Sequence, residues 1–370
     1  MILALAALSV PSCINAQDEG VLSDWQSYAQ CSWIRRMDVC GDNLWLTTNG
    51  GLLKYDKTTK EMTLFNSSNS GLKDNLTTSI ACRGGDVWVG MQYSGVCRYD
   101  GSEFHLYDSS NTPIVINQDC DAMVFDSEGS LWIGGLFYIY KYDGEEWTVY
   151  DFPELELAAL ASFNSLAFDS RGTLWFGCQG PYREEFGRIV RGQSPEWIPT
   201  NLRYVNSIAE AKDGSVWASS RSGIGRYDGK EFQYFNTGNS PIPDNLTSGL
   251  VTDNSGNVWF GCQNKLFKYD GQQFTSYDTP TESRVFTLKV DGSSIWVGTY
   301  DGLFRFSDGN FESIETPGSF MTTNTMGFHS VADKAGNVYV ATNESLLALS
   351  PDGQWESLFY KQVKWDNRIS

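Results

Sequence analysis

Residues 256–271 read GNVWFGCQNKLFKYDG, and this stretch decides the fold. Two short runs rich in aromatic and β-branched residues, VWFGC at 258–262 and LFKYD at 266–270, are typical of β-strands. The run GLVTD at 249–253 precedes them, and FTSYD at 274–278 follows them. Asp270-Gly271 favours a tight hairpin before the last run, because glycine accepts the positive φ of such turns. The stretch therefore predicts four short antiparallel strands, called A to D in chain order.

This unit recurs along almost the whole chain. Seven further stretches match it: GDNLWLTTNGGLLKYD (41–56), GGDVWVGMQYSGVCRYDG (84–101), EGSLWIGGLFYIYKYDG (128–144), RGTLWFGCQG (171–180), DGSVWASSRSGIGRYDG (213–229), GSSIWVGTYDGLFRFSDG (292–309) and AGNVYVATNESLLALSPDG (335–353). Strand B of each copy carries an aromatic anchor, 37 to 44 residues from the next: Trp45, Trp88, Trp132, Trp175, Trp217, Trp259, Trp296 and Tyr339. A period of about 40–45 residues with four short strands is typical of β-propeller blades.

We therefore predict an all-β fold, a β-propeller of eight blades of four antiparallel strands, over about residues 24–365. Two aromatic runs, WQSYA at 25–29 and WESLFY at 355–360, resemble D strands and compete to close the ring. Seven blades with an accessory strand pair is the alternative. We expect the anchor aromatics to pack blade against blade rather than to bind sugars, because burial of a large aromatic stabilises a fold by about 2–3 kcal/mol.

The first residues, MILALAALSVPSCINAQ at 1–17, form an apolar run of about signal-peptide length, too short to span a membrane. We expect residues 1–16 to be removed as a signal peptide after Ala16, which leaves a single propeller domain over 17–370. The alternative is a lipoprotein attached at Cys13. No later segment is apolar for long enough to cross a bilayer. The chain is therefore expected to be exported, to the periplasm or to the cell surface and medium.

The chain has eight cysteines, whose spacings match no small disulfide scaffold and no C-x-x-C metal site. Cys178 and Cys262 occupy the same position in two repeats, so the fold should hold them apart. Cys31 with Cys40 is the one disulfide pair that the sequence suggests.

Charge and motif content argue against several function classes. The formal net charge of −18 would repel nucleic acid and anionic lipid. The nucleophile-elbow, phosphate-loop and zinc-protease motifs are missing. Of the two histidines, His105 is expected on an outer strand D, whereas His329 precedes the last strand A near the loop face and is the one candidate general base. We expect no enzyme, and so no catalytic residue, cofactor or metal.

Aspartates open several of the turns between strands A and B. These Asp-x-x-Gly turns lack the acidic spacing of a calcium loop, so we expect each aspartate to cap its own backbone turn. The turns begin at Asp126, Asp169, Asp253 and Asp333.

Three stretches, GNVWFGCQNKLFKYDG, DGSVWASSRSGIGRYDG and NTGNSPIPDNLTS (236–248), resemble the two-component-regulator propeller repeat. The resemblance covers nearly all of the chain after residue 16. It implies an exported bacterial propeller, either the sensor half of a hybrid two-component system or a stand-alone form, and we expect the stand-alone form. In the sensors the propeller continues into an immunoglobulin-like module, a membrane helix and a kinase. The resemblance is specific for the fold and names no ligand.

The irregular connections should gather on one face of the ring. Antiparallel strands place the A-to-B and C-to-D turns on one face and the B-to-C and D-to-A connections on the other. The long segments belong to the second set, and variable loops on a rigid frame commonly bind ligands. Side chains that follow strand B would then surround the channel opening on that face: Tyr93, Phe137, Tyr138, Tyr182, Arg183, Arg221, Gln263, Asn264 and Tyr300.

We expect this face to bind a carbohydrate or a peptide, which would make the chain a ligand-binding or sensing module. The alternative is a structural or assembly scaffold that docks another exported protein. A deep aromatic-lined funnel would favour the small ligand, and a flat apolar patch of several hundred Å² would favour the protein. A minor alternative is an enzyme like the streptogramin lyases, propellers with similar repeats that use a histidine base and magnesium.

Overall fold

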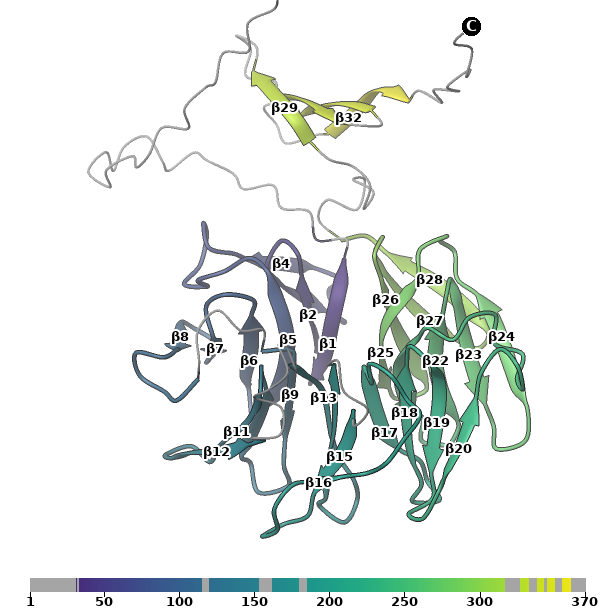
Figure 1. Cartoon of the computed structure of the whole chain (residues 1–370). Helices are drawn as coiled ribbons and strands as arrows, with labels where there is room; N and C mark the ends of the chain where they lie inside the picture. The colour runs from purple at the N-terminus through teal and green to yellow at the C-terminus, as the bar shows by residue number, and fades with distance from the viewer. Residues whose placement is uncertain are drawn as a thin grey trace, which may run out of the picture.

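The computed structural model describes residues 31, 33–114, 120–152, 162–179, 185–316, 327–332, 338–342, 345–349 and 355–360. Within these residues the chain forms β-strands and no helix. The strands make eight four-stranded antiparallel sheets, each built from strands that are consecutive in sequence. Seven of the sheets stand around a common axis as the blades of a β-propeller (Figure 1). The predicted all-β propeller fold is confirmed.

Each of the seven blades runs from an inner strand A to an outer strand D. The inner strands, which line the central channel, are β1 (Ile34–Cys40), β5 (Thr77–Arg83), β9 (Ala122–Phe125), β13 (Ser162–Phe168), β17 (Ser207–Glu210), β21 (Thr247–Thr252) and β25 (Val285–Asp291). The B strands are β2 (Asn43–Thr48), β6 (Asp86–Met91), β10 (Leu131–Gly134), β14 (Leu174–Gln179), β18 (Val216–Ser220), β22 (Val258–Cys262) and β26 (Ser294–Thr299). The C strands are β3 (Leu52–Asp56), β7 (Val96–Tyr99), β11 (Tyr138–Tyr142), β15 (Phe186–Ile189), β19 (Gly223–Tyr227), β23 (Lys265–Tyr269) and β27 (Leu303–Ser307). The D strands are β4 (Met62–Phe65), β8 (Phe104–Tyr107), β12 (Trp147–Asp151), β16 (Glu196–Trp197), β20 (Phe232–Phe235), β24 (Phe274–Asp278) and β28 (Asn310–Ile314).

The anchor tryptophan of each blade packs against the next blade. Trp132 of β10 lies in one buried cluster with Leu174 and Phe176 of β14. Trp217 of β18 meets Phe260 of β22 in the same way. Across the ring these indoles are at most 6% exposed: Trp45, Trp88, Trp132, Trp175, Trp217, Trp259 and Trp296. The predicted packing of blade against blade is confirmed.

The ring closes between the seventh blade and the first. Trp296 of β26 shares a buried cluster with Leu44 and Leu46 of β2. Lys289 of β25 also pairs with Asp38 of β1, with 2.6 Å between Nζ and Oδ1. Because these two blades already cover each other, an eighth blade has no place between them. The prediction of eight blades is therefore wrong, and the alternative of seven blades is confirmed.

The eighth repeat folds into a sheet of its own. Its strands are β29 (Gly327–Ala332), β30 (Val338–Thr342), β31 (Ser345–Leu349) and β32 (Trp355–Tyr360). Figure 1 shows this sheet, in yellow, outside the ring. The run WESLFY thus forms the outer strand of a complete four-stranded sheet rather than a strand that closes the ring. The run WQSYA and Asp333 lie outside the described residues.

Aspartates hold the turns between strands A and B. Asp169 accepts hydrogen bonds from the backbone N–H of Thr173 at 2.8 Å and from Nε1 of Trp175 at 3.0 Å. Burial disfavours the charged carboxylate, but these hydrogen bonds outweigh it and hold the pKa of Asp169 below its ordinary value. Asp126 and Asp253 make the equivalent backbone and indole hydrogen bonds. These are the turn caps that the sequence predicts.

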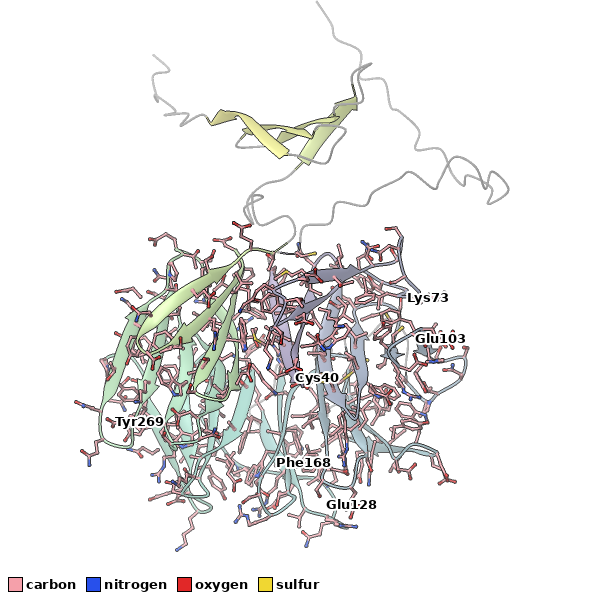
Figure 2. The ribbon with its side chains drawn as sticks, turned by 180° about the vertical axis from the view of Figure 1, so that it is seen from behind. Cys40, Lys73, Glu103, Glu128, Phe168 and Tyr269 are labelled. Carbon is pink, nitrogen blue, oxygen red and sulfur yellow. A yellow bond between two sulfur atoms is a disulfide. The ribbon has the colours of Figure 1, made fainter. Side chains whose placement is uncertain are left out.

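One disulfide joins the first two blades. It links Cys40, which ends β1 and is labelled in Figure 2, to Cys82 near the end of β5, with 6.1 Å between the Cα atoms. The suggested pair of Cys31 with Cys40 is wrong. Cys31 precedes the start of β1 and Cys40 ends it, and the seven residues of this strand alone span about 20 Å. Neighbouring inner strands, by contrast, bring equivalent ends together.

Candidate ligand site at the mouth of the central channel

Two adjoining cavities occupy the axis of the ring. The first, of about 310 Å³, is lined by residues of all seven inner strands. The second, of about 250 Å³, lies where these strands begin. We call it the channel mouth. It is lined by Arg35, Arg36, Thr78, Asp121, Asn164, Gln179, Tyr204, Asn206, Arg221, Leu246, Ser248, Arg284, Phe286 and Tyr300.

Three kinds of segment supply most of the lining of the channel mouth, and Gln179 adds the end of the B strand β14. Most of these residues lie at the start of an inner strand, as Arg35 does in β1 and Phe286 in β25. Arg221 and Tyr300 come from B-to-C connections, and Tyr204 comes from a D-to-A connection. Both kinds of connection therefore meet at one end of the channel, as the alternation of strand directions predicts.

Arg36 lines both cavities and reaches across the axis. Its guanidinium donates hydrogen bonds to the backbone carbonyls of Arg35 and of Asn164 in the fourth blade, at 3.1 Å each. Burial lowers the pKa of Arg36, and the negative charge of Asp121 opposes this effect. Arginine remains protonated in folded proteins. A fixed positive charge therefore lies at the inner end of the channel mouth.

Two more arginines of the channel mouth lie over aromatic rings. The guanidinium carbon of Arg221 is 4.0 Å from the centre of the Tyr204 ring, and that of Arg35 is 5.0 Å from the Trp33 ring. Cation–π contacts of this kind engage the face of the guanidinium and leave its N–H groups available at the edge. Both residues line the channel mouth, so the two charges are held at its wall.

Carboxylates balance part of this positive charge. Arg284 lies 3.5 Å from Asp244, between Nη2 and Oδ2, and both side chains are partly exposed. Asp121 belongs to the lining itself and accepts a hydrogen bond from the Ser162 hydroxyl at 3.2 Å. The buried carboxylate of Glu185 pairs with Arg203 at 3.7 Å and also interacts electrostatically with Arg221. Counting Arg203, five guanidinium groups therefore face three carboxylates around the channel mouth, and the local charge is positive in a protein whose formal net charge is −18.

The rings of Phe286 and Tyr300 line one side of the channel mouth, and Trp33 packs against both. The Trp33 ring centroid lies 5.0 Å from that of Tyr300 and 5.8 Å from that of Phe286. Two buried polar atoms nearby, Nε1 of Trp33 and Oδ1 of Asn164, have no hydrogen-bond partner among the described residues. Buried polar atoms are ordinarily paired, so water or a ligand would satisfy both. The arrangement offers ring faces, hydrogen-bonding groups and positive charge within one small cavity.

The nine residues expected around the channel opening occupy several different positions. Arg221 and Tyr300 line the channel mouth. Phe137 packs against the cluster between the third and fourth blades, and Tyr138 against the one between the second and third. Tyr93 is 54% exposed and does not line the described cavity.

Gln263 and Asn264 serve as backbone acceptors. The carbonyl of Gln263 accepts a hydrogen bond from the N–H of Val285 at 2.9 Å, and the carbonyl of Asn264 accepts one from the N–H of Thr279 at 3.0 Å. These bonds tie the β22–β23 turn to the chain that leads into the next blade. Tyr182 and Arg183 lie outside the described residues.

The sequence prediction missed the residues that precede or open strand A. Arg35, Arg36, Tyr204, Arg284 and Phe286 all line the channel mouth but do not follow a strand B. A signal for them exists in the repeat, because inner strands converge on the axis and each blade brings the beginning of its strand A to the same place. An alignment of the repeats at that position would have found Arg35, Arg36 and Arg284. Arg221 follows strand B and would not appear in it.

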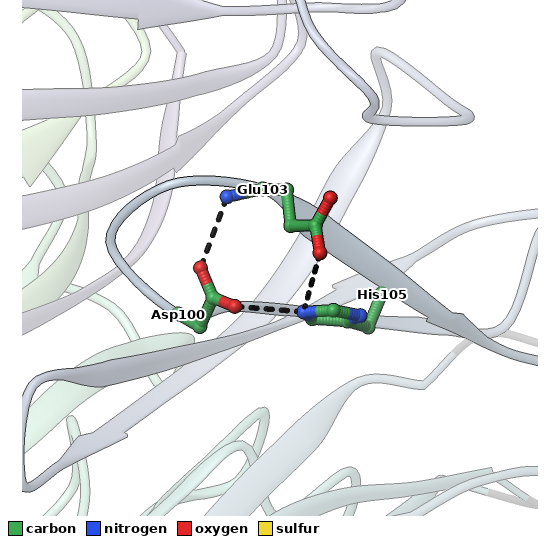
Figure 3. A group of neighbouring side chains, drawn as sticks. All are labelled: Asp100, Glu103 and His105. Carbon is green, nitrogen blue, oxygen red and sulfur yellow. Dashed lines mark hydrogen bonds and ion pairs between the residues drawn. The ribbon is translucent and has the colours of Figure 1, made fainter.

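His105 lies on the outer strand β8, as predicted, within an exposed polar group (Figure 3). Its Nε2 is 2.8 Å from Oδ2 of Asp100 and 3.7 Å from Oε1 of Glu103. Asp100 also accepts the backbone N–H of Glu103, and this bond together with His105 holds the pKa of Asp100 below its ordinary value. Asp143 and Asp228 make the same backbone bond in their own hairpins without a histidine, so the aspartate serves the turn.

His329 lies in β29, within the sheet that Figure 1 shows outside the ring. The described lining of the channel mouth contains no histidine. None of the described residues belongs to a helix that is long and apolar enough to cross a membrane.

No protein-family model matches the sequence, and no curated protein matches it either. Solved structures do resemble the fold. A streptogramin B lyase is 18% identical, with a TM-score of 0.57 over 78% of this chain and 95% of its own. YCF48 bound to D1 peptide is 14% identical, with a TM-score of 0.56 over 75% and 94% of the two chains. These identities show that the propeller fold is shared and nothing finer.

The extracellular domain of BT4673 from B. thetaiotaomicron, described as a putative one-component system, is 15% identical with a TM-score of 0.40. The match covers 89% of this chain. The chain spans 61% of the length of that domain.

Proposed function

We propose that this chain is an exported propeller that binds a small ligand, a carbohydrate or a peptide, at the channel mouth, and that it works as a binding or sensing module and not as an enzyme. The observation that carries the proposal is the convergence of side chains from all seven blades on one cavity of about 250 Å³. A concave site with aromatic walls and a few placed polar groups is the usual form of a small-molecule site.

The distribution of apolar surface favours a small ligand over a protein partner. Among the described residues, the exposed large hydrophobic side chains are Tyr93 and Val149, at 54% and 41% exposure. Tyr93 follows β6 in the second blade, and Val149 lies in β12 of the third. Protein-docking faces usually present a contiguous apolar patch of several hundred Å². Two residues on separate blades do not make one within the described surface.

The fold alone does not choose between binding and catalysis, because propellers of this fold include the streptogramin B lyase and YCF48, which is bound to D1 peptide. The polar groups of the described channel mouth are arginines, amides, hydroxyls and one carboxylate. This set suits recognition of charge and hydroxyl groups, whereas the proton transfer of a lyase would need a group that titrates near neutral pH.

Export is supported by two features of the chain. The apolar run at 1–17 has the length of a signal peptide. The disulfide between Cys40 and Cys82 is a bond that persists in oxidising compartments and is rare in the reducing cytosol. Together they favour a protein that works in the periplasm or outside the cell.

A thermal-shift screen of the purified chain against glycans and short peptides tests this function. A ligand that binds only the folded state raises the melting temperature, by an amount that grows with its concentration over Kd. Tyr300→Ala should abolish the shift of any hit, because Tyr300 lines the channel mouth. Tyr93→Ala, an exposed aromatic outside that cavity, is the matched control and should leave the shift unchanged.

Two results would contradict the proposal. One is a hit whose shift survives Tyr300→Ala, since its site would lie elsewhere. The other is turnover of a hit by the purified chain, since the module would then be an enzyme.

A further inference from the structure

We infer that the channel mouth is an oxyanion site, which takes the carboxylate or phosphate group at the end of a small acidic ligand. The inference rests on the proposed function, because it assumes that the channel mouth is where a ligand binds. It adds the chemical class of the group that is recognised.

The first argument is the concentration of charge. The chain has 27 lysines and arginines against 45 aspartates and glutamates, yet Arg35, Arg36, Arg221 and Arg284 line this one cavity. Their described counter-charges are the carboxylates of Asp121 and Asp244, together with that of the buried Glu185, which Arg221 shares with the neighbouring Arg203. With Arg203 included, five arginines stand against three carboxylates, so the mouth keeps an excess of two positive charges. An acidic protein would repel anions from the rest of its surface and attract them here.

The second argument is the state of the individual guanidinium groups. Arg36 is committed to two backbone carbonyls, and Arg284 faces Asp244. Arg35 and Arg221 instead lie over aromatic rings, and within the described part of the chain neither donates a side-chain hydrogen bond. A planar guanidinium with its edge available matches the two oxygens of a carboxylate or phosphate group.

The third argument is the size of the cavity and what surrounds it. At about 250 Å³ it is slightly smaller than the range of about 300–1,000 Å³ usual for sites that enclose a drug-sized molecule. It therefore fits the charged end of a ligand better than a whole chain. The Tyr300 and Phe286 rings beside the arginines offer apolar faces to the carbon skeleton that carries the anion.

Three sugars that differ only at carbon 6 test the inference: glucuronate carries a carboxylate there, glucose 6-phosphate a phosphate ester, and glucose a neutral hydroxymethyl group. Each is titrated into the full chain labelled with nitrogen-15 in its arginines, while the side-chain Nε–H signals are followed by NMR. At least one charged sugar should shift the signals of Arg221 and Arg35 and bind with a Kd at least tenfold lower than glucose. Raising the salt concentration should weaken that binding and leave any binding of glucose unchanged.

Two variants test whether binding depends on positive charge at the channel mouth or only on the net charge of the protein. Arg221→Gln replaces the guanidinium by a neutral amide that can still donate hydrogen bonds, and it should raise the Kd of the charged sugar at least tenfold. Arg191→Gln removes the same charge from the opposite face, where Arg191 lies in a C-to-D turn and pairs with Glu128 at 2.5 Å. This control should leave the Kd unchanged. Circular dichroism shows whether each variant keeps the fold, and Arg35→Gln is the substitute if Arg221→Gln does not.

The outcomes distinguish failure of this inference from failure of the proposed function. If glucose binds as tightly as both charged sugars, the site is real and the oxyanion inference is wrong. If neither charged sugar shifts the Arg35 and Arg221 signals, the inference is also wrong, while a glycan or peptide hit that depends on Tyr300 still supports the proposed function. If glucuronate binds and glucose 6-phosphate does not, the recognised group is a carboxylate, and the reverse identifies a phosphate.

Discussion

The indole of Trp296 in the seventh blade meets the ring of Tyr55 in the first blade edge to face, with 5.7 Å between their centroids. This contact repeats, across the join of the ring, the packing that the other anchors make between consecutive blades. The two residues are separated by almost the whole propeller in sequence, so their contact fixes where the ring closes.

Removal of the Trp296 indole should weaken the contact between the seventh and first blades. The effect should be as large as that of removing an anchor tryptophan between any other two blades. Trp296→Ala is expected to lower the free energy of unfolding by about 3–5 kcal/mol, the usual cost of replacing a buried Trp or Phe by Ala. Trp217→Ala, between the fifth and sixth blades, is the matched comparison and should cost about the same in urea unfolding. A cost below about 1 kcal/mol for Trp296→Ala alone would mean that the first and seventh blades are not joined in solution.

The seven-bladed ring should fold without the eighth repeat. A chain that ends at Thr316 keeps every blade from β1 to β28 and the closing contacts of Trp296. We expect its melting temperature to stay within about 2–4 °C of that of the full chain, a difference of about 1 kcal/mol. Thermal unfolding followed by circular dichroism measures this. A truncated chain that lost its cooperative transition would instead favour an eight-bladed ring.

The sequence predicted the blades well because their signals are local. An aromatic anchor in strand B recurs in every unit and an Asp-Gly pair before strand D in six of the eight, and neither signal depends on distant parts of the chain. The number of blades in the ring, by contrast, depends on contacts between residues that are far apart in sequence. The eighth repeat has the same pattern as the others, with Tyr339 in the anchor position, and nothing within it states that Trp296 already contacts Leu44 and Leu46.

The candidate site was predicted only in part for a related reason. Arg221 and Tyr300 follow a strand B, where a search of the variable connections finds them. Arg35 and Arg284 lie beside the start of strand A, and their role depends on the convergence of seven inner strands on the axis. Their charges come from blades that are far apart in sequence, so their clustering became visible only in the folded ring.

The disulfide should stabilise the join of the first two blades. Cys40 and Cys82 are 42 residues apart, and closing a loop of that size in the unfolded chain corresponds to about 4 kcal/mol in the chain-entropy model. Replacing both cysteines by serine should therefore lower the urea midpoint. Reductant should lower it in the natural chain and have no further effect on the double variant. If reductant acts equally on both, the stabilising bond lies elsewhere.

Acid should weaken the propeller through its turn aspartates, and Asp169 is the clearest case. Its side chain is buried and accepts hydrogen bonds from Thr173 and Trp175, so its folded-state pKa lies below the value of about 3.9 expected in the unfolded chain. A lowered pKa means that the contribution is complete above about pH 4 and is lost as the pH falls from there through the folded-state pKa. Asp169→Asn should therefore lower the free energy of unfolding by about 1–3 kcal/mol at pH 7. Below about pH 4 the difference in free energy of unfolding between the variant and the natural chain should become smaller. Urea unfolding at pH 7, 4 and 2.5 measures both effects, with the exposed Glu145→Gln as a control for the loss of one charge. If this difference in free energy of unfolding stays constant over the pH range, the hydrogen bonds to Asp169 do not depend on the charge of its carboxylate.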